Sequence, residues 1–257
     1  MVELKRLHDY CNQLLAADTF RDYCPNGLQV EGRPQIKKIV AGVTASQQFL
    51  EQAITRGADA VLVHHGYFWK GEAPVITGIK KQRIQTLLQH DVSLLAYHLP
   101  LDAHALLGNN ITLAQQLDFA QPKVADTLLR QGDNQGLLWQ GELAQALTAE
   151  QFGLHIESRL QRMPTHLPSR SLRPIKTLAW CTGAAQGYIE QAAQLGVDAY
   201  VSGEVSEQTF HLARELDLHY FAIGHHASES YGVQALAKHL AQQFDLEWEF
   251  VNVANPV

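Results

Sequence analysis

The stretch IKKIVAGVTASQQFLEQAITRGADAVLVHHG, residues 36–66, carries the pattern that decides the fold. Its β-rich start, Ile36–Val43, is followed by Ser46–Arg56, in which apolar residues recur at helical spacing. Gly57 is placed to end that helix, and the apolar run Ala60–Val63 predicts a second strand. This order indicates a βαβ unit, and therefore parallel strands in a sheet that helices cover.

The alternation continues on both sides of this stretch. An opening helix is predicted over Leu4–Leu15, a further helix over Ile79–His90, and a further strand over Val92–Tyr97. We therefore expect the first part of the chain to be one α/β unit.

The same pattern returns 139 positions later. IKTLAWCTGAAQGYIEQAAQLGVDAYVSGEV, residues 175–205, aligns without gaps with residues 36–66 and shares Ile-Lys, Glu-Gln-Ala and Gly-x-Asp-Ala with it. Beyond the aligned block, YHLPLD (Tyr97–Asp102) matches GHHASE (Gly224–Glu229), since each places a histidine four residues before an acid. We interpret these matches as an internal duplication.

The predicted fold is therefore α/β, with two related halves whose mostly parallel sheets are covered by helices. The first half is expected to span residues 1–125 and the second residues 126–257. Within the second half, residues 126–174 are expected to connect the halves and to contain a capped helix near Thr148–Leu160, while residues 175–257 form the repeat.

Composition excludes several classes of protein. The 257 residues are 46% hydrophobic and 18% charged, with a net charge of −6 and a pI near 6.1, which does not indicate nucleic-acid binding. No apolar run approaches the roughly 20 residues of a membrane span, and charges near the start exclude a secretory signal peptide. The cysteines are odd in number and unpaired in sequence, as expected of reduced thiols in a cytoplasmic protein (Cys11, Cys24 and Cys181).

Histidines and acids gather where the predicted strands end. They are His64-His65, His98 with Asp102, Glu204, and His225 with Glu229. Ligands of parallel sheets collect at the carboxyl ends of the strands, so these side chains are expected to converge. Imidazoles and carboxylates in this number can serve a dinuclear metal centre, with ions about 3.5–4 Å apart.

Other residues near these motifs allow more than one interpretation. His104 and His226 adjoin the motifs, and we expect neither to be a metal ligand. Tyr67-Phe68-Trp69 can cover the edge of the core, or form a stacking wall beside the metals with Lys70 reaching an anionic group. The remaining histidines are predicted to be structural or exposed (His8, His90, His155, His166, His211, His219 and His239).

At these residues the sequence resembles the Nif-three-like family of the YbgI type, whose members are named GTP cyclohydrolase 1 type 2 homologs. The likeness covers essentially the whole chain and is specific in PNGLQVEG (Pro25–Gly32), GADAVLVHHGYFWKG (Gly57–Gly71) and HLPLDAHALLGNN (His98–Asn110). The resemblance implies a ring-shaped homohexamer and a dinuclear divalent-metal site. The ligands that it implies are all intact here: His64, His65, Asp102, His225 and Glu229. Many relatives have tyrosine in place of His226.

The expected function is that of a metal-dependent hydrolase, since a pair of ions holds a water as a nucleophile near neutral pH. The resemblance points to opening of the purine ring of GTP or a related nucleotide by attack at C8. The alternative is a non-catalytic metal-binding toroid that binds a protein or nucleic-acid partner. A nicotinamide oxidoreductase is disfavoured because Gly42–Ser46 lacks GxGxxG spacing, and no phosphate loop of the GxxxxGK[ST] type is present. Ligation without thiolate fits zinc, manganese, iron or nickel.

The duplication adds two residues that the resemblance does not assign. Aligning the repeats puts Glu204 opposite His65, and His98 opposite His225. We therefore predict that Glu204 and His98 lie close to the metals, where they orient ligands or transfer protons. The alternative is that each only orients a neighbouring loop.

Overall fold

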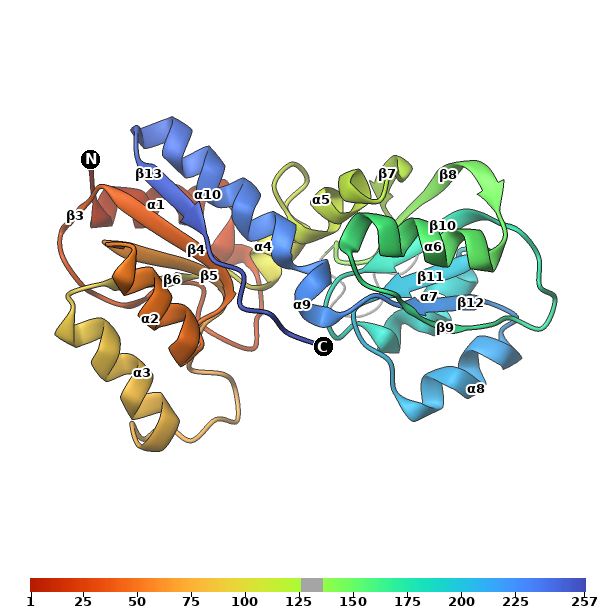
Figure 1. Ribbon diagram of the computed structural model, residues 1–257, viewed down its shortest axis with the longest axis horizontal. Helices are drawn as coiled ribbons and strands as arrows, with labels where there is room; N and C mark the ends of the chain where they lie inside the picture. The colour runs from red at the N-terminus through yellow and green to blue at the C-terminus, as the bar shows by residue number, and fades with distance from the viewer. Residues whose placement is uncertain (126–135) are drawn as a thin grey trace. The chain divides into compact units, whose positions relative to one another are not determined.

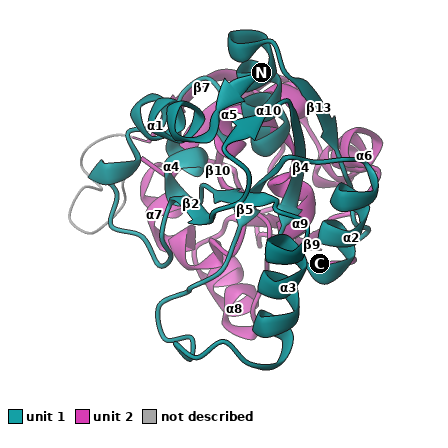
Figure 2. Ribbon diagram, turned by 90° about the vertical axis from the view of Figure 1, so that its left-hand side faces the viewer, with its two compact units in different colours: residues 1–108, 232–254 teal, residues 109–231, 255–257 magenta. Residues whose placement is uncertain are grey.

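The computed structural model describes residues 1–125 and 136–257, which form two compact units (Figures 1 and 2). Unit 1 contains residues 1–108 and 232–254, and unit 2 contains residues 109–231 and 255–257. In each unit a β-sheet is covered by helices, as predicted.

Unit 1 is built on a five-stranded sheet in the order β13-β4-β5-β6-β2. Its strands and helices are β1 (Val2–Glu3), α1 (Leu4–Leu14), β2 (Gly27–Val30), β3 (Gln35–Ile36), β4 (Lys38–Thr44), α2 (Gln47–Thr55), β5 (Ala60–His65), α3 (Gly78–Gln89), β6 (Ser93–Ala96), α4 (Leu99–Ala103), α10 (Ser230–Phe244) and β13 (Glu247–Phe250). The strands β13, β4, β5 and β6 are parallel, and only β2 runs antiparallel at the edge. This sheet is therefore mostly parallel, as the sequence predicts.

Alternating residues of these strands face two separate apolar layers. Ile39 and Leu62 pack with α1 and α10 on one face, whereas Val40 and Val61 pack with α2 and α3 on the other. Because both faces are buried, the strands read in the sequence as continuous apolar runs rather than as alternating ones.

The predicted boundaries of the first βαβ unit are close to those observed. Ser46 is the N-cap of α2 and accepts a hydrogen bond from the backbone N–H of Phe49. Gly57 ends the helix with a φ of +73°, a left-handed conformation that glycine adopts without strain. The next strand, β5, runs to His65 rather than to Val63, so both histidines belong to the strand itself.

Unit 2 is built on a six-stranded sheet in the order β7-β8-β10-β11-β12-β9. Its strands and helices are α5 (Asn109–Gln116), β7 (Ala120–Val124), β8 (Trp139–Leu147), α6 (Ala149–Leu160), β9 (Thr165–Leu167), β10 (Ile175–Cys181), α7 (Ile189–Gln194), β11 (Ala199–Ser202), α8 (Glu207–Glu215), β12 (His219–Ala222) and α9 (His225–Ser228). Only β10, β11 and β12 are parallel, and β7, β8 and β9 add antiparallel strands at the two sides. This sheet is mixed, which differs from the prediction of mostly parallel halves.

The two units also divide the chain differently from the predicted halves, residues 1–125 and 126–257. The C-terminal segment returns to unit 1, where β13 pairs with β4 and Leu236 of α10 packs in the same layer as α1. The predicted connecting segment, 126–174, instead supplies β8, α6 and β9 of unit 2, apart from residues 126–135, which lie outside the described residues. Its capped helix is confirmed, since Thr148 and Gln151 form a capping box at the start of α6.

One contact recurs at corresponding positions of the proposed repeats. Asp59 accepts hydrogen bonds from the backbone N–H groups of Lys37 (2.8 Å) and Lys38 (3.0 Å). Asp198 accepts the same pair of bonds from Lys176 (3.0 Å) and Thr177 (2.9 Å). The shared contact supports the duplication, which itself stays a prediction.

The edge strand β9 is held to β12 by a pair of histidines. His166 Nε2 lies 3.1 Å from His219 Nδ1, and the ring of His166 stacks on Phe221 with 4.4 Å between ring centroids. Burial, and then the neighbouring His219, lower the pKa of His166 from 6.5 to about 4.

This lowered pKa predicts a loss of stability in acid. The unfolded chain takes up a proton as the pH falls through about 6.5, whereas folded His166 does so only near 4, so the free energy of unfolding falls across that interval. His166→Gln should therefore lose less stability than the parent between pH 7 and pH 4.5, as measured by urea midpoints. His211→Gln, at an exposed position, should behave like the parent. Equal pH dependence of His166→Gln and the parent would contradict this account.

Candidate metal centre

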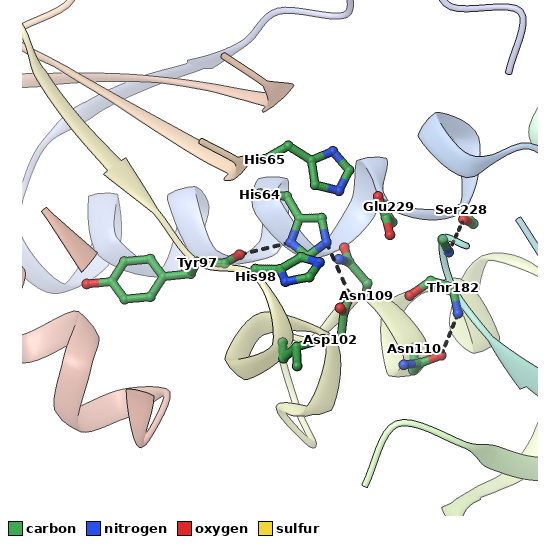
Figure 3. Close-up of polar contacts among 12 residues, drawn as sticks. His64, His65, Tyr97, His98, Asp102, Asn109, Asn110, Thr182, Ser228 and Glu229 are labelled. Atoms are coloured by element: carbon green, nitrogen blue, oxygen red, sulfur yellow. Dashed lines mark hydrogen bonds and ion pairs between the residues drawn. The ribbon is translucent and has the colours of Figure 1, made fainter. Parts of the chain in front are cut away.

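Unit 1 carries a cluster of three imidazoles at the carboxyl end of its sheet. His64 and His65 end β5, and His98 follows β6 as the N-cap of α4. Adjacent side chains of a strand point to opposite faces, yet the ring centroids of His64 and His65 are 4.6 Å apart, and His98 lies 5.0 Å from His64. One nitrogen of each ring lies within 4.8 Å of the others, a spacing that can hold a metal ion (Figure 3).

Each of these imidazoles is held by a contact at Nδ1. His64 is buried and donates from Nδ1 to the carbonyl oxygen of Tyr97 at 2.8 Å, and His65 Nδ1 lies 3.1 Å from Thr44 Oγ1. His98 Nδ1 lies 2.7 Å from the carboxylate of Asp22. A carbonyl or carboxylate can only accept, so His64 and His98 carry a proton on Nδ1, and in the neutral ring Nε2 is then the acceptor. This is the tautomer that metal-ligating histidines adopt.

Asp102 joins this cluster from the short helix α4. Its Oδ1 lies 3.5 Å from His64 Nε2, and its side chain is buried. Figure 3 shows Asp102 and Tyr97 on the two nitrogens of the His64 ring. A cation between His64 Nε2 and Asp102 would therefore meet an imidazole lone pair and a carboxylate from the same unit.

Unit 2 carries a smaller cluster at the carboxyl ends of β11 and β12. His225 lies between two carboxylates, with Nδ1 at 2.7 Å from Glu204 and Nε2 at 3.1 Å from Glu229. Burial alone would lower the pKa of His225, but the hydrogen bonds and charges of Glu229 and Glu204 outweigh it and raise the pKa to about 9. A cation bound by His225 Nε2 and Glu229 would have to displace the proton that lies between them.

The backbone at the end of β10 is shaped to admit Glu229. Gly183 has a φ of +70°, and a Cβ on it would lie 2.2 Å from Glu229 Oε1 and 3.3 Å from His225 Nε2. Its N–H donates to Ser228 Oγ at 3.0 Å, and the preceding N–H of Thr182 donates to Asn110 Oδ1 at 3.1 Å (Figure 3). Glycine is required here both by conformation and by the carboxylate beside it.

The donor chemistry of both clusters fits a divalent cation of borderline character. The residues offer imidazole nitrogens and carboxylate oxygens, which suit zinc, manganese, iron and nickel. Cys24 also lies near Asp22 and His98, but burial, and then the charge of Asp22, raise its pKa to about 12, so it stays a thiol. Cys11, Cys24 and Cys181 are all buried.

Comparison with known proteins identifies the family. The sequence profile of Duf34/NIF3 (NGG1p interacting factor 3) matches residues 2–256. The chain belongs to the DUF34/NIF3 family. The resemblance seen in the sequence is therefore confirmed.

Curated relatives and solved structures agree with this assignment. A protein of Allochromatium vinosum named GTP cyclohydrolase 1 type 2 homolog is 55% identical over 256 residues, covering 100% of this chain and 98% of its own length. A Pseudomonas aeruginosa protein of the same name is 50% identical, covering 99% of each chain. A solved structure described as protein ybgI, of unknown function, has a TM-score of 0.93 and 45% identity over 100% of both chains.

Other predicted residues of this DUF34/NIF3 protein have contacts away from the clusters. His104 Nδ1 accepts hydrogen bonds from the backbone N–H groups of Leu106 and Leu107, which is a structural role. His226 contributes backbone contacts, from its N–H to Val257 and from its carbonyl to Ser230. The remaining histidines make hydrogen bonds within their own unit, in the pairs His8–Asn12, His90–Thr86, His155–Leu117, His166–His219, His211–Glu207 and His239–Tyr10.

The aromatic run after the histidine pair divides between the two predicted roles. Tyr67 is buried, donates its hydroxyl to the carbonyl oxygen of Ala45, and packs in a core layer together with Phe68. Trp69 instead lies beside the imidazoles, 5.9 Å from His65 and 5.0 Å edge-on from His98. Of these three aromatic residues, Trp69 is the one that lies beside the imidazoles.

Two residues of the cluster's surroundings are absent from the sequence-based prediction. Asp22 holds His98, and Asn26 connects them, donating to Asp22 at 2.8 Å and accepting from the backbone N–H of His98 at 2.7 Å. In the sequence, Asn26-Gly27 is typical of a turn, so the side-chain amide of Asn26 does not by itself indicate a contact with His98. Its place in the family-specific PNGLQVEG stretch is the one indication of a further role.

The requirement for glycine at position 183 gives a direct test of the unit 2 cluster. Gly183→Ala should displace the Glu229 carboxylate from His225, so the variant should retain less zinc or manganese than the parent at the same ion concentration. Elemental analysis after equilibrium dialysis measures this. Gly196→Ala is the matched control, because Gly196 also has a φ of +70° but no atom within 4 Å of an added Cβ. Equal metal retention in all three proteins would contradict the assignment.

Proposed function

We propose that this protein is a dinuclear, divalent-metal-dependent hydrolase. The proposed ligands are those that the family resemblance implies, which would bind two cations: His64, His65, Asp102, His225 and Glu229. The observation that carries the proposal is the hydrogen bond at Nδ1 of His64 and of His225, which supports a ligand role through Nε2.

Coordination numbers favour a catalytic over a structural role. Structural sites are closed by four protein ligands per ion, whereas catalytic sites keep a position for water. Five protein ligands shared by two ions leave both with positions for water or substrate. The cations would supply polarisation of the substrate and a lowered pKa of the attacking water.

The protein's own groups would then orient ligands and move protons. Glu204 accepts from His225 Nδ1 at 2.7 Å, so its role is to fix the ring that carries Nε2. His98 presents Nε2 toward His64 and His65, where it can take the proton of the attacking water. We therefore propose that Glu204 orients a ligand and that His98 accepts a proton.

The proposed substrate class is a nucleotide with a purine ring. The names of the relatives, GTP cyclohydrolase 1 type 2 homolog, support a ring opening of GTP or a related nucleotide by attack of water at C8. Trp69, beside the imidazoles, would provide an aromatic surface next to the reacting carbon. The homohexamer stays a prediction, and nothing in this chemistry depends on it.

A turnover assay of the metal-loaded protein tests the proposal. The parent should hydrolyse at least one substrate in a panel of purine nucleotides, phosphoesters and amides, and chelation of the metal should abolish the activity. Glu204→Gln keeps the shape but removes the charge on His225, so activity should fall at least about tenfold while most metal is retained.

Glu207→Gln is the matched control, because Glu207 is exposed and pairs only with the exposed His211 among the contacts of the described residues. A parent that turns over nothing in its metal-loaded form would favour the non-catalytic metal-binding toroid instead. Unchanged activity in Glu204→Gln would contradict the proposal that Glu204 orients the His225 ring.

A further inference from the structure

Asp22 forms the centre of a hydrogen-bond network under His98. Its side chain is 3% exposed, and its Oδ1 lies 2.7 Å from His98 Nδ1 and accepts from the backbone N–H of Tyr23 at 2.6 Å. Its Oδ2 accepts from the backbone N–H of Leu99 at 2.9 Å and from the amide of Asn26 at 2.8 Å. Four donors therefore converge on one buried carboxylate.

This network keeps Asp22 ionised. Burial alone would raise the pKa of Asp22, but the hydrogen bond and charge of His98, together with Asn26 and Tyr23, lower it to about 2. An ionised carboxylate can only accept, so its contact with His98 requires a proton on Nδ1.

The arrangement corresponds to that of His225 in one respect and differs in another. His98 and His225 occupy matching positions of the repeat, and each has a carboxylate 2.7 Å from Nδ1. In unit 2 the acid four residues later, Glu229, meets Nε2 of the same histidine, whereas in unit 1 Asp102 meets His64 instead. His98 therefore has a carboxylate at Nδ1, as His225 does. The acid four residues after it, Asp102, contacts the ring of His64 and not that of His98.

We propose that Asp22 is a positioning residue that fixes His98 in the Nδ1–H tautomer, so that Nε2 faces His64 and His65 as a proton acceptor. The inference rests on the proposed function, in which His98 accepts a proton, and it assigns to Asp22 the orientation of His98. In that step the proton of the attacking water passes to His98 Nε2, and the negative charge of Asp22 stabilises the imidazolium that forms. Asn26 connects the Asp22 carboxylate to the backbone N–H of His98 by a hydrogen bond to each.

The substitution Asp22→Asn has a specific expected consequence. An amide has one oxygen, and on the Oδ2 side both partners are fixed donors: the backbone N–H of Leu99, and the Asn26 amide whose own oxygen accepts from the N–H of His98. The Oδ1 side has one fixed donor, the backbone N–H of Tyr23, beside His98, which can change from donor to acceptor by moving its proton. Placing the NH₂ group on the Oδ1 side therefore leaves one fixed donor without its acceptor, whereas placing it on the Oδ2 side leaves two. The new NH₂ group should therefore face His98 Nδ1 and force the proton onto Nε2.

Nitrogen NMR of the metal-free protein with ring-labelled histidine tests the tautomer without any activity assay. The His98 signals are assigned by their loss in His98→Gln. In the parent, Nδ1 should show the shift of a protonated ring nitrogen and Nε2 that of a lone-pair nitrogen, and Asp22→Asn should exchange the two. A parent spectrum with the proton on Nε2 overturns the inference, so the test does not require that the variant fold.

Kinetics of the metal-loaded protein provide the second measurement. Asp22→Asn should lower kcat by at least about 100-fold with KM and metal content near those of the parent, because Asp22 acts only through His98. Asp59→Asn is the matched control: Asp59 is also a largely buried acid of unit 1 that accepts from two backbone N–H groups, and its loss should leave kcat unchanged.

The two measurements separate the inference from the proposed function. Persistence of the Nδ1–H tautomer in Asp22→Asn overturns the positioning role, whatever the activity. If the parent hydrolyses nothing but the tautomer switches as expected, the positioning role stands and the proposed hydrolysis fails.

Discussion

The hydrogen bond at Nδ1 of each cluster histidine is the interaction on which the candidate site depends. His64 is held by a backbone carbonyl, His65 by Thr44, His98 by Asp22 and His225 by Glu204. The four partners are a backbone carbonyl, a hydroxyl and two carboxylates, but each contact is made at the same ring nitrogen. Because Nδ1 of every ring is engaged in this way, a cation or a further proton would be bound at Nε2.

The fold supplies these partners because they lie at strand ends. Thr44 ends β4 beside His65 at the end of β5, and the two residues are paired in register in the sheet. Tyr97 follows β6, whose parallel pairing with β5 brings its carbonyl to His64. Parallel pairing therefore fixes both the candidate ligand and the group that orients it.

Much of this arrangement could be predicted from the sequence, and the missing parts have a common cause. The β4–α2–β5 pattern is local, and strand-end histidines follow from it directly. By contrast, Asp22 contacts a residue 76 positions away, and β13 joins a strand from the other end of the chain, so no local pattern reports either. The antiparallel strands β8 and β9 were predicted to be part of a connection, since their sequences lack the apolar runs of doubly covered strands.

The central claim is the proposal that the five candidate ligands bind a pair of cations. Anomalous diffraction from crystals of the protein loaded with zinc or manganese tests it most directly. The account predicts two anomalous peaks per chain, about 3.5–4 Å apart, with His64, His65, Asp102, His225 and Glu229 as the protein ligands. A single peak, or two peaks separated by much more than this distance, would contradict it.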